Sequence, residues 1–491
     1  MSFISKLSEA SISIENLSVF IQSNSIELYD FFISQKNSSI TGYRTEIEEY
    51  ILPKFSIYNK LDFTDSKNQT FLFCLLDVSQ RFGLLTEFEQ LFNLANRNNV
   101  TLNSRLNASA KFLINVNSID DYKNRIDEIL SNLSISFLEE EDNEQKAIAT
   151  LVNFYTEVFQ NFGRQNIEGV IEFKTILLEE LKKEKYSFLQ TQSIDEVLAY
   201  SLDNIDELYQ AVHTKLDEIL ERASQYLAFN IEPHLIESDS HYAELLEDIS
   251  ANFNEIRKLC VKLYSVVASN EIFWSLQRGV KVLTEQNQLL AYLNSYGKMH
   301  YAKMMSAIDP VEQKDLQEKL EVYDWGCGQG LASACFLEYL NNNGIEYSVN
   351  KFTLIEPSEI AIKRASLHLR KYTTNTQIIT INKDFDSLDN NDFESNENTI
   401  KIHLFSNILD IDLFSLSDLI NLLKHNFKGK NIFICASPYV DNRKTERIDS
   451  FVQSFSTNTD FNLIFKLSEK KGEWAGTDWT RVIRVFKCQI E

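Results

Sequence analysis

The feature that most constrains the fold of this 491-residue chain is a change of sequence pattern near Pro310. Beyond this proline, short runs of β-branched and aromatic residues alternate with segments whose apolar residues recur at helical spacing. Such alternation predicts a mainly parallel, doubly wound sheet with helices on both faces. The seven predicted strands are 321–326, 350–357, 376–384, 399–407, 430–438, 461–469 and 480–489, and the predicted helices are 331–343, 358–372, 413–427 and 444–455.

The last two predicted strands are joined by residues 468–481, which show no helical spacing. Two strands that follow each other without a crossover helix pair as an antiparallel hairpin. The sheet is therefore expected to have seven strands and to end in an antiparallel hairpin. That ending is uncommon in dinucleotide-binding dehydrogenases.

The first 310 residues are poor in glycine and have helical periodicity, as in 119–133, 195–227 and 243–267. No sequence repeat occurs at a fixed period, so we expect an irregular bundle or a degenerate solenoid, with a break near residue 140. The predicted fold class is α + α/β. An all-helical domain is expected over 1–280 and an α/β domain over 281–491.

Charge is distributed unevenly along the chain, whose formal net charge is −23. Residues 321–491 contain 19 Lys and Arg against 23 Asp and Glu, whereas residues 1–320 contain 29 against 48. A surface as acidic as that of the first 320 residues repels phosphate backbones. Free nucleic acid is therefore not the expected ligand of the helical part, while a basic protein partner is compatible with it.

The remaining composition gives no sign of a membrane span or of a metal site. No stretch approaches the roughly 20 apolar residues that cross a bilayer, and the N-terminus lacks the apolar core of a secretory signal. The six cysteines and seven histidines are scattered without metal-ligand spacing. A cytoplasmic location and buried, reduced thiols are expected.

The first predicted strand runs directly into Asp324-Trp-Gly-Cys-Gly-Gln-Gly330, and a predicted helix follows at once. Glycines allow a sharp turn and a close approach of the backbone to a ligand, and the following helix offers free N–H groups. The spacing GxGxG differs from the GxGxxG that admits a pyrophosphate. The loop resembles the first motif, DxGxGxG, of the class I S-adenosylmethionine (SAM)-dependent methyltransferases.

This resemblance implies that SAM binds at the loop and at the ends of the next strands. An acid after the second strand binds the ribose hydroxyls in the family, and Glu356 stands there; a carboxylate can accept two hydrogen bonds. An acid after the third strand contacts the adenine, and Asp384 matches it. The fourth strand ends at residues that face the methyl group. The implied cofactor-binding residues are Asp324, Gly326, Gly328, Gly330, Glu356, Asp384 and Ser406, and the implied catalytic residues are Asn407 and Asp410.

Each assignment has a structural alternative. The glycines can serve the strand–helix turn alone, and Glu356 can be an N-terminal acid of helix 358–372. Asp386 and Asp389 rival Asp384, Asp412 rivals Asp410 as a base, and His403 fits an apolar core. Tyr296, His300 and Tyr301, in the helix before the first strand, would contact the methionine end of SAM if that helix closed over it; ordinary helix packing is the alternative.

The acceptor of the methyl group is left open. The fourth strand lacks the Pro-Pro-Tyr/Phe sequence of amine methylation, and Cys435 lacks the preceding proline expected for C5-pyrimidine methylation. Basic and aromatic residues at the sheet edge could clamp a nucleotide or a peptide, or simply form a packed hairpin tip: Arg443, Lys444, Lys470, Lys471, Trp474 and Trp479, with Asp478 beside them.

The sequence thus favours a SAM-dependent methyltransferase acting on a protein, nucleotide or small molecule, with a helical region that binds a partner or regulates the enzyme. A non-catalytic SAM-binding scaffold or sensor is the main alternative. An NAD-dependent enzyme is a weaker one.

Overall fold

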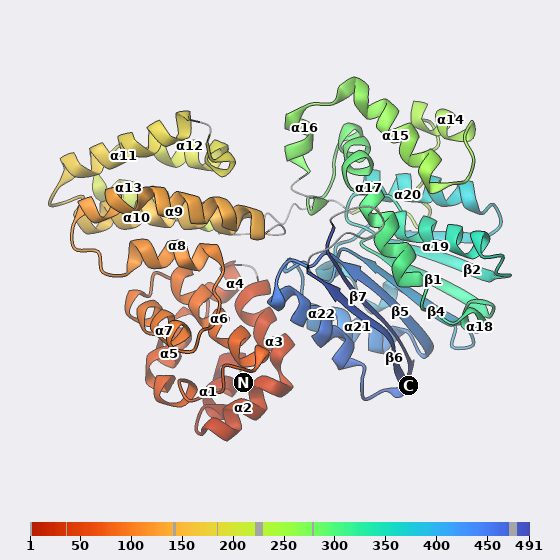
Figure 1. Cartoon of the computed structure of the whole chain (residues 1–491), viewed down its shortest axis with the longest axis horizontal. Helices are drawn as coiled ribbons and strands as arrows, with labels where there is room; N and C mark the ends of the chain where they lie inside the picture. Colours follow the sequence, from red (N-terminus) through yellow and green to blue (C-terminus); the bar gives the residue numbers. More distant parts are fainter. Residues whose placement is uncertain are drawn as a thin grey trace. The chain divides into compact units, whose positions relative to one another are not determined.

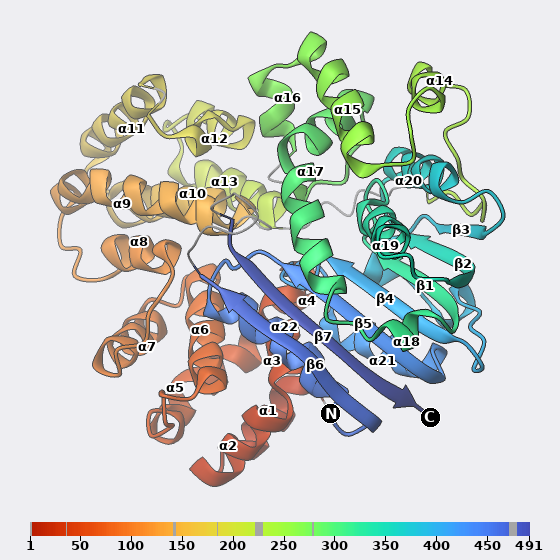
Figure 2. The same ribbon diagram turned by 45° about the vertical axis from the view of Figure 1, so that its right-hand side comes forward.

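The computed structural model describes residues 2–35, 37–140, 144–183, 185–220, 229–276, 279–470 and 479–491. The chain divides into two compact units, Met1–Tyr226 and Leu227–Glu491 (Figures 1 and 2). A domain boundary at residue 280 stays a prediction. Among the described helices, none is both long and apolar enough to cross a membrane.

The first unit is helical, as predicted. Its apolar residues form two clusters that meet at α8, one from the helices before it and one from those after it. Several helices begin at a polar cap; Asp65, for example, accepts hydrogen bonds from the backbone at the start of α6. The helices are α1 (Phe3–Ala10), α2 (Ile14–Ser23), α3 (Ser25–Tyr29), η1 (Asp30–Ser34), α4 (Asn37–Thr41), α5 (Arg44–Tyr58), α6 (Ser66–Arg81), α7 (Leu85–Arg97), α8 (Ser104–Leu113), α9 (Ile119–Glu139), α10 (Glu144–Phe162), α11 (Ile167–Lys182), η2 (Ser187–Gln190), α12 (Gln192–Ala199) and α13 (Ile205–Leu220).

A buried ion network lies where these two clusters meet. Arg105 on α8 pairs with Asp77 on α6, and its Nε is 2.8 Å from a carboxylate oxygen of Glu140 at the end of α9. Arg81 is 2.6 Å from the other oxygen of Asp77. Each charge is thus compensated by an opposite one, which a buried ion requires.

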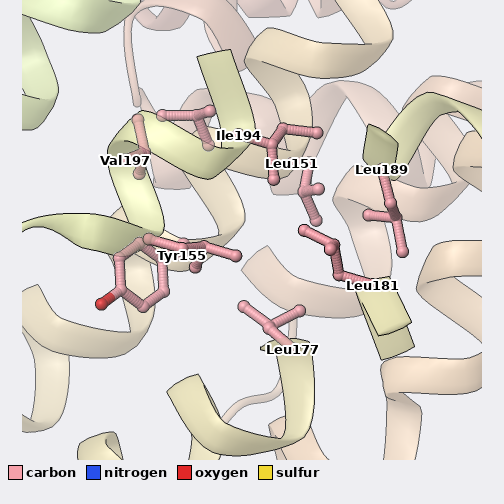
Figure 3. A pocket seen from close by; sticks show the side chains of 9 residues that line it. Leu151, Tyr155, Leu177, Leu181, Leu189, Ile194 and Val197 are labelled. Atoms are coloured by element: carbon pink, nitrogen blue, oxygen red, sulfur yellow. The ribbon is translucent and has the colours of Figure 1, made fainter. Parts of the chain in front are cut away.

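The second cluster also contains a small apolar cavity, lined by Leu151 and Tyr155 of α10, Leu177 and Leu181 of α11, and neighbours on η2 and α12 (Figure 3). Its volume of about 10 Å³ corresponds to roughly one water molecule. It is too small for a cofactor.

The second unit contains the predicted seven-stranded sheet, in the order β3-β2-β1-β4-β5-β7-β6. Strand β7 is antiparallel to both neighbours, and the other pairs are parallel. The prediction of a doubly wound sheet with a terminal hairpin is confirmed. Its strands are β1 (Lys319–Trp325), β2 (Ser348–Ile355), β3 (Gln377–Ile381), β4 (Ile400–Ser406), β5 (Gly429–Ser437), β6 (Thr459–Glu469) and β7 (Arg481–Ile490).

Helices cover both faces of this sheet, and three further helices precede α17 in this unit (Figure 2). The helices α17, α19 and α20 pack together, as do α21 and α22. The bounds are α14 (His241–Glu247), α15 (Phe253–Val267), α16 (Asn270–Ser275), α17 (Gln286–Ile308), α18 (Gln313–Leu316), α19 (Leu331–Asn342), α20 (Glu359–Tyr372), α21 (Leu416–Asn426) and α22 (Asn442–Ser454).

An extended segment, residues 230–237, runs along the outer edge of β3. The backbone N–H of Thr380 donates to the carbonyl of Pro233 at 2.8 Å, and the N–H of Leu235 donates to the Thr380 hydroxyl at 2.9 Å. Glu237 forms a buried ion pair with Arg364 of α20. An open strand edge is a site for unwanted pairing, and this segment covers it.

Candidate functional site

The three glycines after β1 all adopt left-handed backbone conformations, with φ of 63° at Gly326, 51° at Gly328 and 75° at Gly330. A Cβ on Gly326 would lie 2.8 Å from Ile408, and one on Gly330 would lie 3.1 Å from Ala365 of α20. A Cβ on Gly328 would meet no atom within 4 Å. The outer glycines are therefore required by packing, while Gly328 borders open space.

Asp324 supports the loop from behind. Its buried carboxylate accepts hydrogen bonds from the backbone N–H of Ser333 at 3.1 Å and from the Ser333 hydroxyl at 2.7 Å. Burial raises the pKa of Asp324 to about 6, although these two bonds oppose the rise. The carboxylate thus ties the end of β1 to the first turn of α19.

Glu356 follows β2 and reaches the open part of the loop. One of its oxygens accepts the Gly328 N–H at 3.0 Å, and the other accepts the Ser358 N–H at 3.0 Å. Burial raises the pKa of Glu356 to about 7, and the charge of Asp324 adds to the rise against these two bonds. The structure brings Gly328 and Glu356 together, and it also gives Glu356 the contact expected of an acid at the start of α20.

Asp384 is exposed and lies in the turns after β3. Its carboxylate caps η4 (Phe385–Ser387) by accepting the Ser387 N–H at 2.8 Å. Its rivals are also engaged locally: Asp386 accepts the Ser415 N–H at 2.9 Å, and Asp389 caps η5 (Asn390–Asp392). These local bonds do not join Asp384 to the other predicted site residues among the residues that the structure describes.

At the end of β4, side chains from α17 meet Ser406 and Asn407. Asn407 is left-handed, with φ of 56°, and its N–H donates to Ala436 of β5 at 2.7 Å. The Ser406 hydroxyl is 3.2 Å from Nδ1 of His300, and the Asn407 amide nitrogen is 2.9 Å from Nε2 of the same ring. Lys303 donates to the Asn407 amide oxygen at 3.3 Å. The sequence indicates His300 as a possible site residue but not Lys303. The one sequence feature that could have pointed to Lys303 is its position one turn after His300 on the same helix.

The residues that α17 was expected to contribute have different environments. Nε2 of His300 is 2.9 Å from the Tyr292 hydroxyl. Burial, with the charge of Lys303 adding to it, lowers the pKa of His300 to about 3, so the ring is neutral. Tyr301 donates to Glu338 of α19 at 2.9 Å, and therefore lies away from the end of β4. The Tyr296 ring is 5.2 Å from that of Tyr292.

The two acids beyond β4 also differ. One carboxylate oxygen of Asp410 is buried and has no hydrogen-bond partner among the described residues, and burial raises the pKa of this group. Asp412 forms an ion pair with Lys444 at 2.8 Å. Of the two, Asp410 is therefore the acid whose carboxylate is less fully paired.

The glycine-rich loop lies at the carboxyl end of β1, next to the acid after β2 and the polar end of β4. The sheet around it has the order β3-β2-β1-β4-β5-β7-β6, with β7 reversed. This is the fold of a class I SAM-dependent methyltransferase. The resemblance stated from the sequence is confirmed at the level of the fold of the C-terminal half.

Comparisons with known proteins find only distant similarities. No family model and no curated protein matches the chain. Over its C-terminal half the chain is similar to solved methyltransferases. A precorrin-6y C5,15-methyltransferase from Geobacter metallireducens has 11% identity and a TM-score of 0.26, covering 43% of this chain and 91% of its own.

Two further solved structures are comparably distant. The plantazolicin methyltransferase BpumL, in complex with a monoazolic desmethylPZN analogue and SAH, has 11% identity and a TM-score of 0.28, covering 48% of this chain and 99% of its own. A putative class I methyltransferase from Listeria monocytogenes has 12% identity and a TM-score of 0.30, covering 67% and 90%. Their acceptors therefore say nothing about the acceptor of this chain.

Other residues of the methyltransferase fold have structural roles. His403 is fully buried, 3.2 Å from the Trp325 indole nitrogen and 3.0 Å from Asn431, as expected of a core histidine. All six cysteines are buried and free. No group of three metal-ligating residues occurs in the described part of the chain.

The structure describes only some of the basic and aromatic residues that were predicted at the sheet edge. Arg443 pairs with Asp441 at 2.7 Å, and Lys470 lies 5.1 Å from the centre of the Tyr439 ring. Lys444 is buried in its ion pair with Asp412. Lys471, Trp474 and Asp478 lie outside the described residues.

Proposed function

We propose that the second unit binds SAM at the glycine-rich loop and transfers its methyl group to an acceptor held at the end of β4. The observation that carries this proposal is the open space beside Gly328, bordered by the carboxylate of Glu356. In this proposal Glu356 binds the ribose hydroxyls, Asp324 holds the loop, and Asp384 lies near the adenine.

SAM supplies an activated methyl group, so the chain needs mainly to orient the acceptor and exclude water. In this proposal Ser406 contacts the cofactor, and Asn407 faces the acceptor where it meets the methyl group. Asp410 is the proposed base for the proton of the acceptor nucleophile, because burial raises the pKa of its carboxyl group and makes it a better base than an exposed carboxylate. The proposed catalytic residues are therefore Asn407 and Asp410.

Two measurements on the full chain test this function. Calorimetry should detect binding of SAM and S-adenosylhomocysteine but not of NAD. Incubation of cell extracts with methyl-labelled SAM should then label one of the protein, RNA or small-molecule fractions. Binding of SAM without labelling of any fraction would favour a non-catalytic scaffold or sensor.

We further propose that the acidic helical region binds a protein partner or regulates the second unit. Support comes from the 48 acidic against 29 basic residues in positions 1–320, which suit a basic partner. If the immobilised full chain retains a protein partner at low salt and releases it at high salt, this role is supported.

A further inference from the structure

One face of α17 presents a row of polar side chains to the end of β4. Tyr292, His300 and Lys303 are linked in turn, the last two through Asn407. In Figure 2, α17 lies across the sheet, where it contacts β5 and β7. The row therefore belongs to a helix that is docked on the sheet, rather than to a loop.

Asn407 is held at both its backbone and its side chain. Its backbone is left-handed, a conformation that Asn adopts more readily than most residues, and its N–H donates to the carbonyl of Ala436. Its amide nitrogen faces the His300 ring, and its amide oxygen accepts from Lys303. Both ends of the amide are thus fixed by one helix.

Burying the two α17 residues costs free energy, because polar side chains lose their hydration. Lys303 is fully buried and His300 is 5% exposed. A buried lysine loses its hydration and must be compensated. An apolar residue at either position would dock α17 at lower cost, so packing alone does not explain the pair.

We infer that His300 and Lys303 are positioning residues, which fix the side-chain amide of Asn407 and through it the acceptor nucleophile. This inference rests on the proposed function, in which Asn407 faces the acceptor. It assigns His300 to the acceptor side rather than to the methionine end of SAM. Removing either residue should impair methyl transfer while leaving cofactor binding in place.

The test compares four variants of the full chain. His300→Gln and Lys303→Met remove the two contacts, and Lys303→Arg keeps the charge. Lys298→Met is the matched control, because Lys298 is an exposed lysine of the same helix. Binding of S-adenosylhomocysteine should stay within about twofold in all four variants. Labelling of the acceptor should fall at least tenfold in the first two, recover partly in Lys303→Arg and stay unchanged in Lys298→Met.

A second readout does not depend on catalysis. Nitrogen-15 labelling of the seven histidines allows the His300 ring signals to be assigned by their loss in His300→Gln. These signals should show a neutral ring at pH 6 and should shift in Asn407→Leu and in Lys303→Met, but not in Lys298→Met. If no extract is labelled although the cofactor binds, the proposed catalysis fails, and these shifts alone decide the positioning of Asn407.

Three results would overturn the inference. The first is unchanged labelling in both His300→Gln and Lys303→Met. The second is a loss of S-adenosylhomocysteine binding as large as the loss of labelling, which would assign α17 to the cofactor. The third is a His300 signal that does not respond to Asn407→Leu.

Discussion

Gly328 differs from the other two glycines of the loop in the space around its Cα. A Cβ at Gly326 or Gly330 would collide with Ile408 or Ala365, whereas a Cβ at Gly328 would project into open space. Substitution at the outer glycines therefore tests folding. Substitution at Gly328 tests ligand binding.

We expect Gly328→Val to abolish SAM binding in calorimetry, because its side chain would occupy the space proposed for the cofactor. The left-handed backbone would also be strained, so the control is Gly344→Val in the turn after α19. Gly344 has φ of 60° and equally open surroundings, but it is not part of the site. Equal SAM affinity in Gly328→Val and in Gly344→Val would disprove the assignment of the loop.

Glu356 should make SAM binding depend on pH. Its pKa is raised to about 7, and ribose hydroxyls donate to the ionised carboxylate. Binding therefore favours the charged form: affinity should be full above pH 7 and should fall as the pH drops below it, by up to about tenfold per unit. Calorimetry from pH 5.5 to 8 measures the slope.

The matched variant is Glu356→Gln, which should bind SAM weakly and without this slope. If the SAM affinity of Glu356→Gln still falls, but only below pH 6, the fall would be due to Asp324, whose pKa is raised to about 6. An affinity of the unaltered chain that is constant from pH 5.5 to 8 would remove Glu356 from the cofactor site.

At the scale of the elements, the strands and the loop between β1 and α19 were predictable from the sequence. Their signals are local: short runs of β-branched and aromatic residues, and three glycines within five residues. The contacts of α17 and of segment 230–237 were not, because they join residues far apart in the chain. His300 and Ser406 are 106 positions apart, and Leu235 and Thr380 are 145 apart. Nothing local in either sequence specifies such a partner.

The junction of α6, α8 and α9 provides a stability test. Arg105→Ala would leave the buried carboxylate of Asp77 with one cation fewer and Glu140 without its partner on α8. We expect a loss of about 3–5 kcal/mol in the free energy of unfolding of the first unit, measured in urea. Arg164→Ala, which breaks an exposed pair with Asp206, should cost less than about 1 kcal/mol. Similar losses in the two variants would contradict a buried network.

For the whole molecule, the boundary between the units can be tested with fragments. Fragment 229–491 keeps the segment along β3 and the Glu237–Arg364 pair, whereas fragment 281–491, which begins at the boundary predicted from the sequence, lacks both. We therefore expect 229–491 to be folded and 281–491 to aggregate or melt at a lower temperature, because the edge of β3 is open. Equal melting temperatures and equal solubility would support the boundary at 280.

The pairing of segment 230–237 with the outer edge of β3 also affects the order in which the chain folds during translation. Segment 230–237 leaves the ribosome before every strand of the sheet, and 145 residues separate Leu235 from its partner Thr380. At about 5–20 residues per second, the segment waits about 7–30 s for β3 to emerge. The helices of the first unit, with both apolar clusters and the ion network, lie entirely upstream. The helical unit is therefore complete while the second unit is still being translated, and the binding of the partner proposed for it does not have to wait for the sheet to form.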